Sequence, residues 1–270
     1  MFLFFISLVF GIHHAVWLSE ANAEPFGKGT AAGEKRTLSI RGIDYTFCWC
    51  PPGEFTMGSP ESEEGREDDE TLHPVTLTCG FWLLESEVTQ GMWNSVMGND
   101  RDGDLTEQYG KGGLYPMHSV NWGECQEFCR KLGELTRESV RLPTEAEWEY
   151  ACRAGTAGSY AGTGILDDMG WHVGNSGGKI HEVKGKEPNA WGLYDMHGNV
   201  WEWCSDRYGA YLPDGVETDP QGPSGGSSRV YRGGSWIHNA CLCRSAVRFN
   251  DEPTFRSFIL GFRPAVVPAD

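Results

Sequence analysis

The most informative segment of this chain is GLYDMHGNVWEW, residues 192–203. It combines turn-forming glycines with two acidic side chains, Asp195 and Glu202, and two tryptophans. Oxygen ligands of this kind suit a hard cation such as calcium, and backbone carbonyls turned inward around Gly198 could complete the set. The alternative is a buried aromatic turn in which Asp195 and Asn199 only hydrogen-bond the backbone. These residues alone leave both interpretations open.

The beginning of the chain predicts a secretory signal peptide, residues 1–23. Residues 2–11 are almost entirely apolar, and residues 21–23 read Ala-Asn-Ala, which is a small-residue cleavage pattern. No Lys or Arg precedes the apolar stretch, so an uncleaved hydrophobic tail is the alternative. The apolar stretch is too short to cross a bilayer, and we expect the mature protein not to span a membrane. The expected location is secreted, periplasmic or on the cell surface.

The rest of the chain is expected to form a flexible segment, residues 24–36, and a single domain, residues 37–270. The whole chain has 270 residues, and no Gly/Ser-rich or Pro-rich linker divides its middle.

The charge of the chain argues against nucleic acid as a partner. It has 22 basic and 38 acidic side chains, which give a formal net charge of −16. Such a protein repels a nucleic-acid backbone. Part of the charge lies in residues 61–70, where acidic side chains crowd a stretch with few apolar residues. We expect this stretch to be a solvated loop.

Nine cysteines fit an exported protein in which disulfides persist. Because nine is odd, at least one thiol stays outside any pair within the chain. Cys125 and Cys129 are four residues apart in a helical pattern and share a face, but they lack the partners of a zinc site. We interpret them as structural.

Two helices and several strands are expected from hydrophobic periodicity. Apolar and polar residues alternate over 37–57 and 73–88, which predicts strands. Apolar residues recur every three or four positions from Asn121 to Leu135, which predicts an amphipathic helix capped by Asn121. Thr144 and Glu147 form the capping-box pattern of a second helix that runs to about Arg153 and stops at Gly155. The remainder is expected to be irregular, with short strands at 228–236, 245–249 and 260–267.

Several separated motifs resemble the formylglycine-generating enzyme, or sulfatase-modifying-factor, family. They are FTMG at 55–58, EVT at 87–89, RLPTEAEWEY at 141–150, the 192–203 stretch, RGGSW at 232–236 and GFR at 261–263. The match runs from about Phe55 to the C-terminus. The resemblance implies an α+β, C-type-lectin-like fold with two helices, small antiparallel sheets and much irregular loop.

The same resemblance implies metal sites. A structural calcium ion would be held by the carboxylates of Asp195 and Glu202 and by the carbonyls of Gly198 and Val200. A second calcium site would begin near Asn175 and Ser176, where no clear acidic partner follows.

Enzymatic members of the family bind copper(I) through a cysteine pair after the Arg-Gly-Gly-Ser motif. The positions that match this pair are interpreted as His238 and Ala240, so the pair is missing. Cys241 and Cys243 are close by and would share a face on a strand, which offers a shifted copper site. Alternatively, Cys243 forms a disulfide with Cys204.

The C-terminal region, residues 232–263, also resembles the variable region of proteins diversified by retroelements that mutate adenines. Fixed frame residues alternate there with positions of mixed chemistry that follow no helix or strand period, as on a binding surface. The alternative is an ordinary loop of the family. The candidate ligand-binding residues are Ile237, His238, Asn239, Cys241, Leu242, Val247, Phe249, Asn250, Asp251, Glu252, Thr254, Phe255, Ser257, Phe258 and Ile259.

The sequence therefore predicts a secreted, calcium-stabilised binding domain whose partner is a protein or another cell-surface ligand. The rival prediction is a copper-dependent oxidase that converts a sulfatase cysteine to formylglycine. In that case Cys241 and Cys243 would bind copper, and Ser235 and Arg248 would line the pocket.

Overall fold

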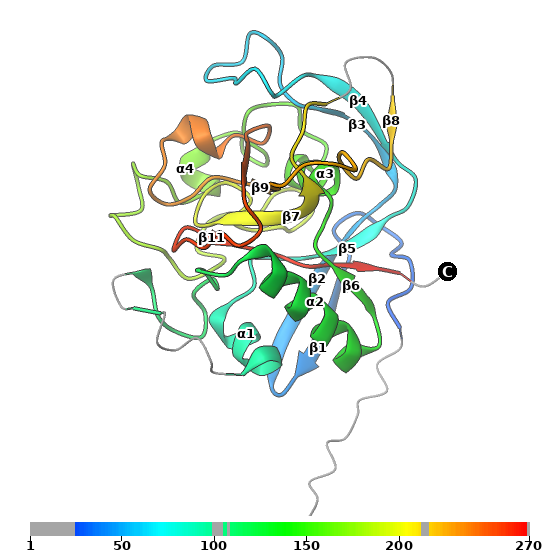
Figure 1. Cartoon of the computed structure of the whole chain (residues 1–270), viewed down its shortest axis with the longest axis vertical. Coiled ribbons are helices and arrows are strands. Elements are labelled where there is room, and N and C mark those ends of the chain that lie inside the picture. Colours follow the sequence, from blue (N-terminus) through cyan, green and yellow to red (C-terminus); the bar gives the residue numbers. More distant parts are fainter. Residues whose placement is uncertain (1–24, 99–104, 107–108, 212–215, 269–270) are drawn as a thin grey trace, which may run out of the picture.

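The computed structural model describes residues 25–98, 105–106, 109–211 and 216–268. Its largest sheet has five strands in the order β1-β2-β5-β12-β6, and all neighbouring strands run antiparallel. Strand β12, near the end of the chain, lies between β5 and β6. A C-terminal strand is therefore an inner strand of the sheet that the N-terminal strands begin (Figure 1). The strands are β1 (Lys35–Ile40), β2 (Ile43–Cys50), β5 (Phe81–Leu84), β6 (Ser139–Arg141) and β12 (Ala265–Val267).

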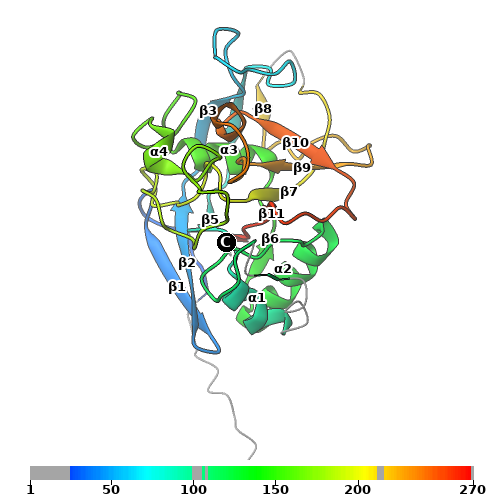
Figure 2. The same ribbon diagram turned by 90° about the vertical axis from the view of Figure 1, so that its left-hand side faces the viewer.

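Two smaller sheets lie beside the first. One has the order β10-β9-β7-β11, in which only the β11–β7 pair is parallel. The other has the order β3-β4-β8 and lies at the opposite end of the molecule from the β1–β2 hairpin (Figure 2). Their strands are β3 (Gly53–Met57), β4 (His73–Leu77), β7 (Trp201–Arg207), β8 (Glu217–Thr218), β9 (Arg229–Arg232), β10 (Arg248–Asp251) and β11 (Leu260–Gly261).

Both predicted helices are confirmed, together with their caps. Helix α2 (Trp122–Thr136) begins after Asn121, and helix α3 (Glu145–Arg153) begins after Thr144. Each helix start is a capping box with both reciprocal hydrogen bonds present, which satisfies backbone N–H groups of the first turn. Helix α3 ends at Arg153, as predicted, and both Ala154 and Gly155 have positive φ angles, of 44° and 89°, at its C-terminal cap.

Further short helices were not predicted: α1 (Gln90–Met97), α4 (Leu166–Met169) and the 3₁₀ helix η2 (Ala240–Cys243). All are eight residues or shorter, so a hydrophobic period has few turns in which to show itself. The overall class is nevertheless the predicted one, a mixed α+β fold with small sheets and long irregular connections.

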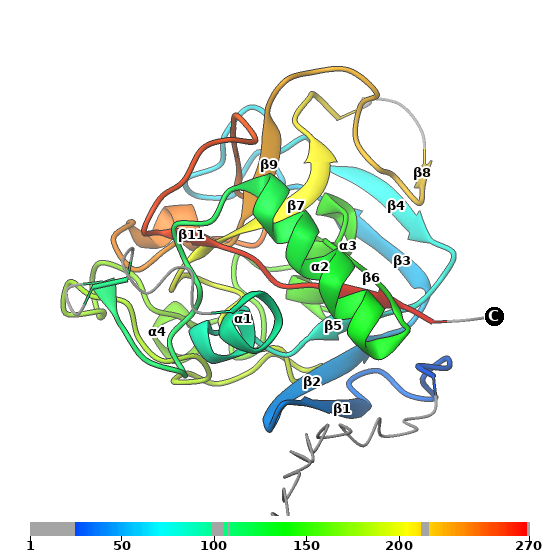
Figure 3. The same cartoon turned by 60° about the horizontal axis from the view of Figure 1, so that its bottom comes forward.

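The main core lies between the five-stranded sheet, α1 and α2. Trp93 of α1 stacks on Phe128 of α2 at 5.7 Å between ring centroids, and Phe128 meets Phe262 edge-on at 5.2 Å. Helix α2 runs alongside β6 (Figure 3), and its buried face includes Cys125 and Cys129, as expected for structural cysteines. Burial of such large rings contributes about 2 to 3 kcal/mol per side chain.

The flexible N-terminal segment predicted for residues 24–36 is wrong for the part that the structure describes. Phe26 is 1% exposed and meets Phe47 and Trp82 edge-on at 5.4 and 5.3 Å. Strand β1 already begins at Lys35. The polar, Gly-rich composition of the segment suggested flexibility, but its aromatic residue Phe26 packs into the core. The predicted signal peptide, residues 1–23, lies outside the described residues.

Candidate ligand-binding surface

The 192–203 stretch is a run of tight turns that leads into a buried strand. Asp195, Gly198 and Asn199 have positive φ angles of 56°, 99° and 56°. A Cβ atom on Gly198 would collide with the Trp171 carbonyl, so glycine is required there. The last residues of the stretch, from Trp201 onward, start β7, which the sequence analysis did not predict.

Glu202 does not fit the predicted calcium ligand set. Arg263 donates hydrogen bonds to both carboxylate oxygens of Glu202, at 2.6 Å each. The indole N–H of Trp148 donates a further hydrogen bond to this carboxylate at 2.8 Å. Glu202 and Arg263 are both fully buried. The guanidinium thus supplies the positive charge that a cation would otherwise supply to this carboxylate.

Unlike Glu202, Asp195 has one carboxylate oxygen without a hydrogen-bond partner among the described residues. Its Oδ2 accepts a hydrogen bond from the Lys184 backbone at 2.7 Å, whereas Oδ1 is buried and unsatisfied. Glu87 lies next to it and likewise has a buried, unsatisfied Oε2. Burial raises the pKa of Asp195 to about 6, and burial together with the charges of Asp195 and Glu202 raises the pKa of Glu87 well above its ordinary value. Two such carboxylates need a proton or a cation between them.

Neither a copper pair nor a disulfide is formed by the C-terminal cysteines. Cys241 and Cys243 lie in η2 rather than on a strand, so the predicted common face is wrong: Cys241 is exposed, and Cys243 is buried. Burial raises the pKa of the Cys243 thiol to about 12, which disfavours the thiolate that copper needs. The predicted Cys204–Cys243 disulfide is also wrong, since no disulfide joins any of the nine cysteines, all of which lie in the described ranges.

The other residues of the predicted oxidase pocket are engaged elsewhere. Ser235 is buried and hydrogen-bonds His238. Arg248 binds both carboxylate oxygens of Glu145, at 2.6 and 2.7 Å, and lies 3.7 Å from the centre of the Tyr211 ring. Arg248 therefore does not line the same site as Cys241 and Cys243.

Arg248 instead borders a cavity of about 220 Å³ that the sequence analysis missed. Asp206 of β7 also lines the cavity and accepts a hydrogen bond from the first backbone N–H of α3 at 2.9 Å. Burial, followed by the charge of Glu145, raises the pKa of Asp206 to about 7. The cavity had no signal in the sequence, because the residues that line it come from segments far apart in the chain.

The predicted binding residues are solvent-accessible, with one exception. Val247 is fully buried in the main core, so its assignment to the surface is wrong. Exposed positions are Ile237, Asn239, Cys241, Phe249, Glu252, Thr254 and Phe255; half-buried ones are His238, Leu242, Asn250, Asp251, Ser257, Phe258 and Ile259. We call these fourteen residues the display surface.

Aromatic rings support the display surface from below. Trp201, only 2% exposed, packs against Phe249 at 5.2 Å and His238 at 5.6 Å between ring centroids. Phe258 stacks on Tyr109 at 4.3 Å. The apolar side chains of this surface are therefore held in fixed positions, which lowers the conformational entropy lost when a partner binds.

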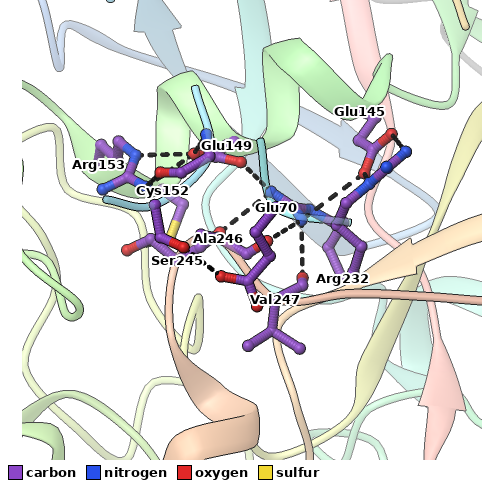
Figure 4. A network of polar contacts seen from close by, with 12 residues as sticks. Glu70, Glu145, Glu149, Cys152, Arg153, Arg232, Ser245, Ala246 and Val247 are labelled. Atoms are coloured by element: carbon purple, nitrogen blue, oxygen red, sulfur yellow. Dashed lines mark hydrogen bonds and ion pairs between the residues drawn. The ribbon is translucent and has the colours of Figure 1, made fainter. Parts of the chain in front are cut away.

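Buried ion pairs fix the backbone on which these side chains are carried. Arg232 donates hydrogen bonds to the carbonyls of Ala246 and Val247, both at 2.7 Å, and pairs with Glu149 of α3, which also binds Arg153 (Figure 4). These contacts tie the loop after β9 to the helix.

A second arginine fixes the η2 turn. Arg244 binds both oxygens of Glu70, at 2.8 and 2.7 Å, and one oxygen of Glu63 at 2.7 Å. Glu70 is fully buried and the Glu63 side chain is 6% exposed. The solvated loop predicted for residues 61–70 is therefore wrong at these two positions, because a distant arginine neutralises them.

The chain matches the family model described as "sulfatase-modifying factor enzyme 1-like domain" over residues 44–267. The chain belongs to this family. Among solved structures, this sulfatase-modifying-factor-like domain is similar to the Treponema denticola variable protein 1, with 31% identity and a TM-score of 0.77. The match covers 87% of this chain and 99% of the other. PvdO from Pseudomonas aeruginosa matches with 27% identity and a TM-score of 0.78, over 88% and 100% of the two chains. The predicted C-type-lectin-like fold is thereby confirmed.

A curated relative of the sulfatase-modifying-factor-like domain is the formylglycine-generating enzyme of Streptomyces coelicolor. The two are 38% identical over 170 residues, which cover 56% of this chain and 52% of the enzyme. The chain thus spans about half the length of this enzyme. Across the described residues, each helix is too short or too polar to cross a membrane.

Proposed function

We propose that this chain is a secreted ligand-binding domain whose display surface contacts a protein or another cell-surface ligand. The observation that carries the proposal is the contrast between exposed apolar side chains, such as Phe249 and Phe255, and the buried ion pairs that hold the segments around them. A rigid scaffold that presents variable side chains is a common way to build a binding site.

Selection from a displayed peptide library tests this function. The wild-type domain is expected to enrich a specific set of binders, and Phe249→Ser and Phe255→Ser are expected to lose them without loss of fold. Leu135→Ser is the matched control, because Leu135 is an exposed apolar residue on α2, outside the display surface. Equal loss of binding in all three variants would contradict the proposal.

Diversification of residues 232–263 by a retroelement belongs to the same proposal. Similarity to a protein described as variable supports it. The deciding observation is the flanking DNA: a near-copy of this coding segment that differs mainly at adenines, beside a reverse transcriptase, is expected. An ordinary family loop would have no such copy.

Calcium has a structural place in this proposal, beside Asp195 and Glu87 and near the carbonyls of Gly198 and Val200. The unsatisfied oxygens of the two carboxylates support it, and Glu202 is excluded as a ligand by Arg263. Calcium is expected to raise the melting temperature of the wild type relative to chelator, and Asp195→Asn should abolish the rise. Asp44→Asn, at an exposed aspartate of β2, is the control. A shared proton instead of calcium predicts no response to chelator.

Oxidation of a sulfatase cysteine to formylglycine is the second candidate function, favoured by the name of the Streptomyces relative. The burial of Cys243, in contrast to the exposure of Cys241, argues against it. Oxygen uptake by the copper-loaded protein with a cysteine-containing sulfatase peptide distinguishes the two functions. Uptake that is lost in Cys241→Ser or Cys243→Ser would favour the oxidase.

A further inference from the structure

His238 lies between two hydrogen-bonding groups beneath the display surface. Its Nδ1 is 2.6 Å from the Ser235 hydroxyl and 3.2 Å from the indole nitrogen of Trp201. Ser235 is fully buried and Trp201 nearly so, whereas His238 is half-buried. The Nδ1 edge of the imidazole therefore faces the interior. The other nitrogen, Nε2, has no hydrogen-bond partner among the residues that the structure describes.

These contacts decide which nitrogen carries the proton. An indole N–H only donates, so Nδ1 must offer its lone pair to Trp201. A neutral imidazole with an unprotonated Nδ1 carries its proton on Nε2. The Ser235 hydroxyl can rotate to donate to the same lone pair. A proton on Nδ1 would point at the indole N–H and break that hydrogen bond.

His197 provides the opposite arrangement within the same molecule. Its Nδ1 is 2.8 Å from the Cys243 carbonyl oxygen, which only accepts, and its Nε2 accepts from the Ala161 N–H at 3.0 Å. His197 therefore carries its proton on Nδ1. It is fully buried, so it is an internal reference for the other tautomer.

We infer that His238 is a specificity-determining residue of the display surface: its Nε2–H is a fixed hydrogen-bond donor for a carbonyl or carboxylate group of the ligand. The inference rests on the proposed binding function. Phe249, which packs on the buried Trp201, forms an apolar rim beside the donor, with Trp201–His238 and Trp201–Phe249 ring centroids 5.6 and 5.2 Å apart. A hydrogen bond beside such a rim is partly shielded from competing water. The ligand group that fits is thus an acceptor next to an apolar moiety.

The same tautomer opposes metal binding at Nε2. A metal ion needs the Nε2 lone pair, which requires moving the proton to Nδ1 and losing the Trp201 hydrogen bond. His238 therefore recognises a ligand atom rather than replacing a copper-binding cysteine.

The tautomer is tested on the ligand-free protein by two-bond ¹H–¹⁵N correlation spectra of ¹⁵N-histidine-labelled samples. The expected result at neutral pH is a protonated Nε2 and an unprotonated Nδ1 for His238, with the reverse for His197. Trp201→Phe, which keeps a ring but removes the indole N–H, should shift His238 toward a mixture of tautomers. Ser235→Ala is the control and should leave the proton on Nε2, because the indole N–H remains. A protonated Nδ1 in the wild type overturns the inference.

The donor role is tested with small probes at equal concentration. Acetate and acetamide, which present acceptors, should shift the Nε2 resonance of His238, and methylammonium, which only donates, should not. In the wild type the Trp201 indole resonance should respond to acetate through His238, and this response should be lost in His238→Phe, which keeps a ring but has no hydrogen-bond donor. A response to methylammonium alone, or to none of the probes, overturns the inference. If the peptide selection fails while these results hold, the proposed function is wrong and the donor assignment stands.

Discussion

Within residues 232–263, the arginines and the positions between them occupy opposite environments. Arg232 and Arg244 are 0% and 1% exposed and ion-paired, whereas Phe249 and Phe255 are 40% and 39% exposed. This reverses the usual preference for charges outside and apolar groups inside. Buried charges are tolerated only with well-placed partners, so each arginine fixes the backbone in one arrangement. The exposed side chains contribute little to that arrangement and are free to serve binding.

The largest expected effect comes from breaking the deepest ion pair. Arg232→Met leaves the Glu149 carboxylate and the carbonyls of Ala246 and Val247 with buried, unsatisfied oxygens. The free energy of unfolding should fall by about 3 to 5 kcal/mol. Urea denaturation measures it. Adding Glu149→Gln to the variant should not recover the loss, because the buried Arg153 also depends on this carboxylate. Full recovery would mean that Arg153 does not need the charge of Glu149.

A smaller loss is expected at the η2 turn. Arg244→Met leaves Glu63 and Glu70 without their counter-charge, but Glu63 lies in a loop that can turn toward water. We expect about 2 to 3 kcal/mol in the free energy of unfolding. Glu63→Gln alone should cost less, because Glu70 keeps Arg244. Urea curves that coincide with the wild type would show that this pair does not hold the turn.

The stability of the folded protein is also expected to depend on pH through Asp206. Burial raises its pKa from an ordinary 3.8 to about 7, so the folded protein binds a proton that the unfolded chain releases. This contribution to stability is complete below about pH 4 and is lost as the pH rises to about 7. Asp206→Asn keeps the acceptor for the α3 N–H and should flatten this part of the profile. Parallel profiles for the two proteins would contradict the assignment.

The smallest expected effect is on the display surface. Phe255→Ser should change the free energy of unfolding by less than about 0.5 kcal/mol. Phe249→Ser should lower it by about 0.5 to 1.5 kcal/mol, because the variant loses the ring contact with Trp201. Thermal melting of the two variants against the wild type measures it. A large loss of unfolding free energy at either position would show that this side chain helps to hold the fold. The contrast between the buried arginines and the exposed side chains would then fail at that residue.

Part of the candidate site could be predicted because it depends on the pattern of neighbouring residues in the sequence. The exposure of Ile237, Phe249 and Phe255 followed from a segment without helix or strand period. Val247 was misplaced because its neighbour Arg248 turns toward Glu145, which puts Val247 into the core. The pairing of Glu202 with Arg263 was missed because the sequence around a carboxylate does not show whether a metal ion or a guanidinium neutralises it.

The two main helices, their capping boxes and the family could all be recognised from the residues alone. Capping and periodicity act over three or four residues, and each can be read locally. Which charges are buried and which side chains are displayed became clear only from the folded arrangement of the chain. The Arg244–Glu70 pair joins residues 174 positions apart, and the Glu202–Arg263 pair joins residues 61 apart. The free energy of a buried charge depends on its partner in space, and no local pattern encodes that partner.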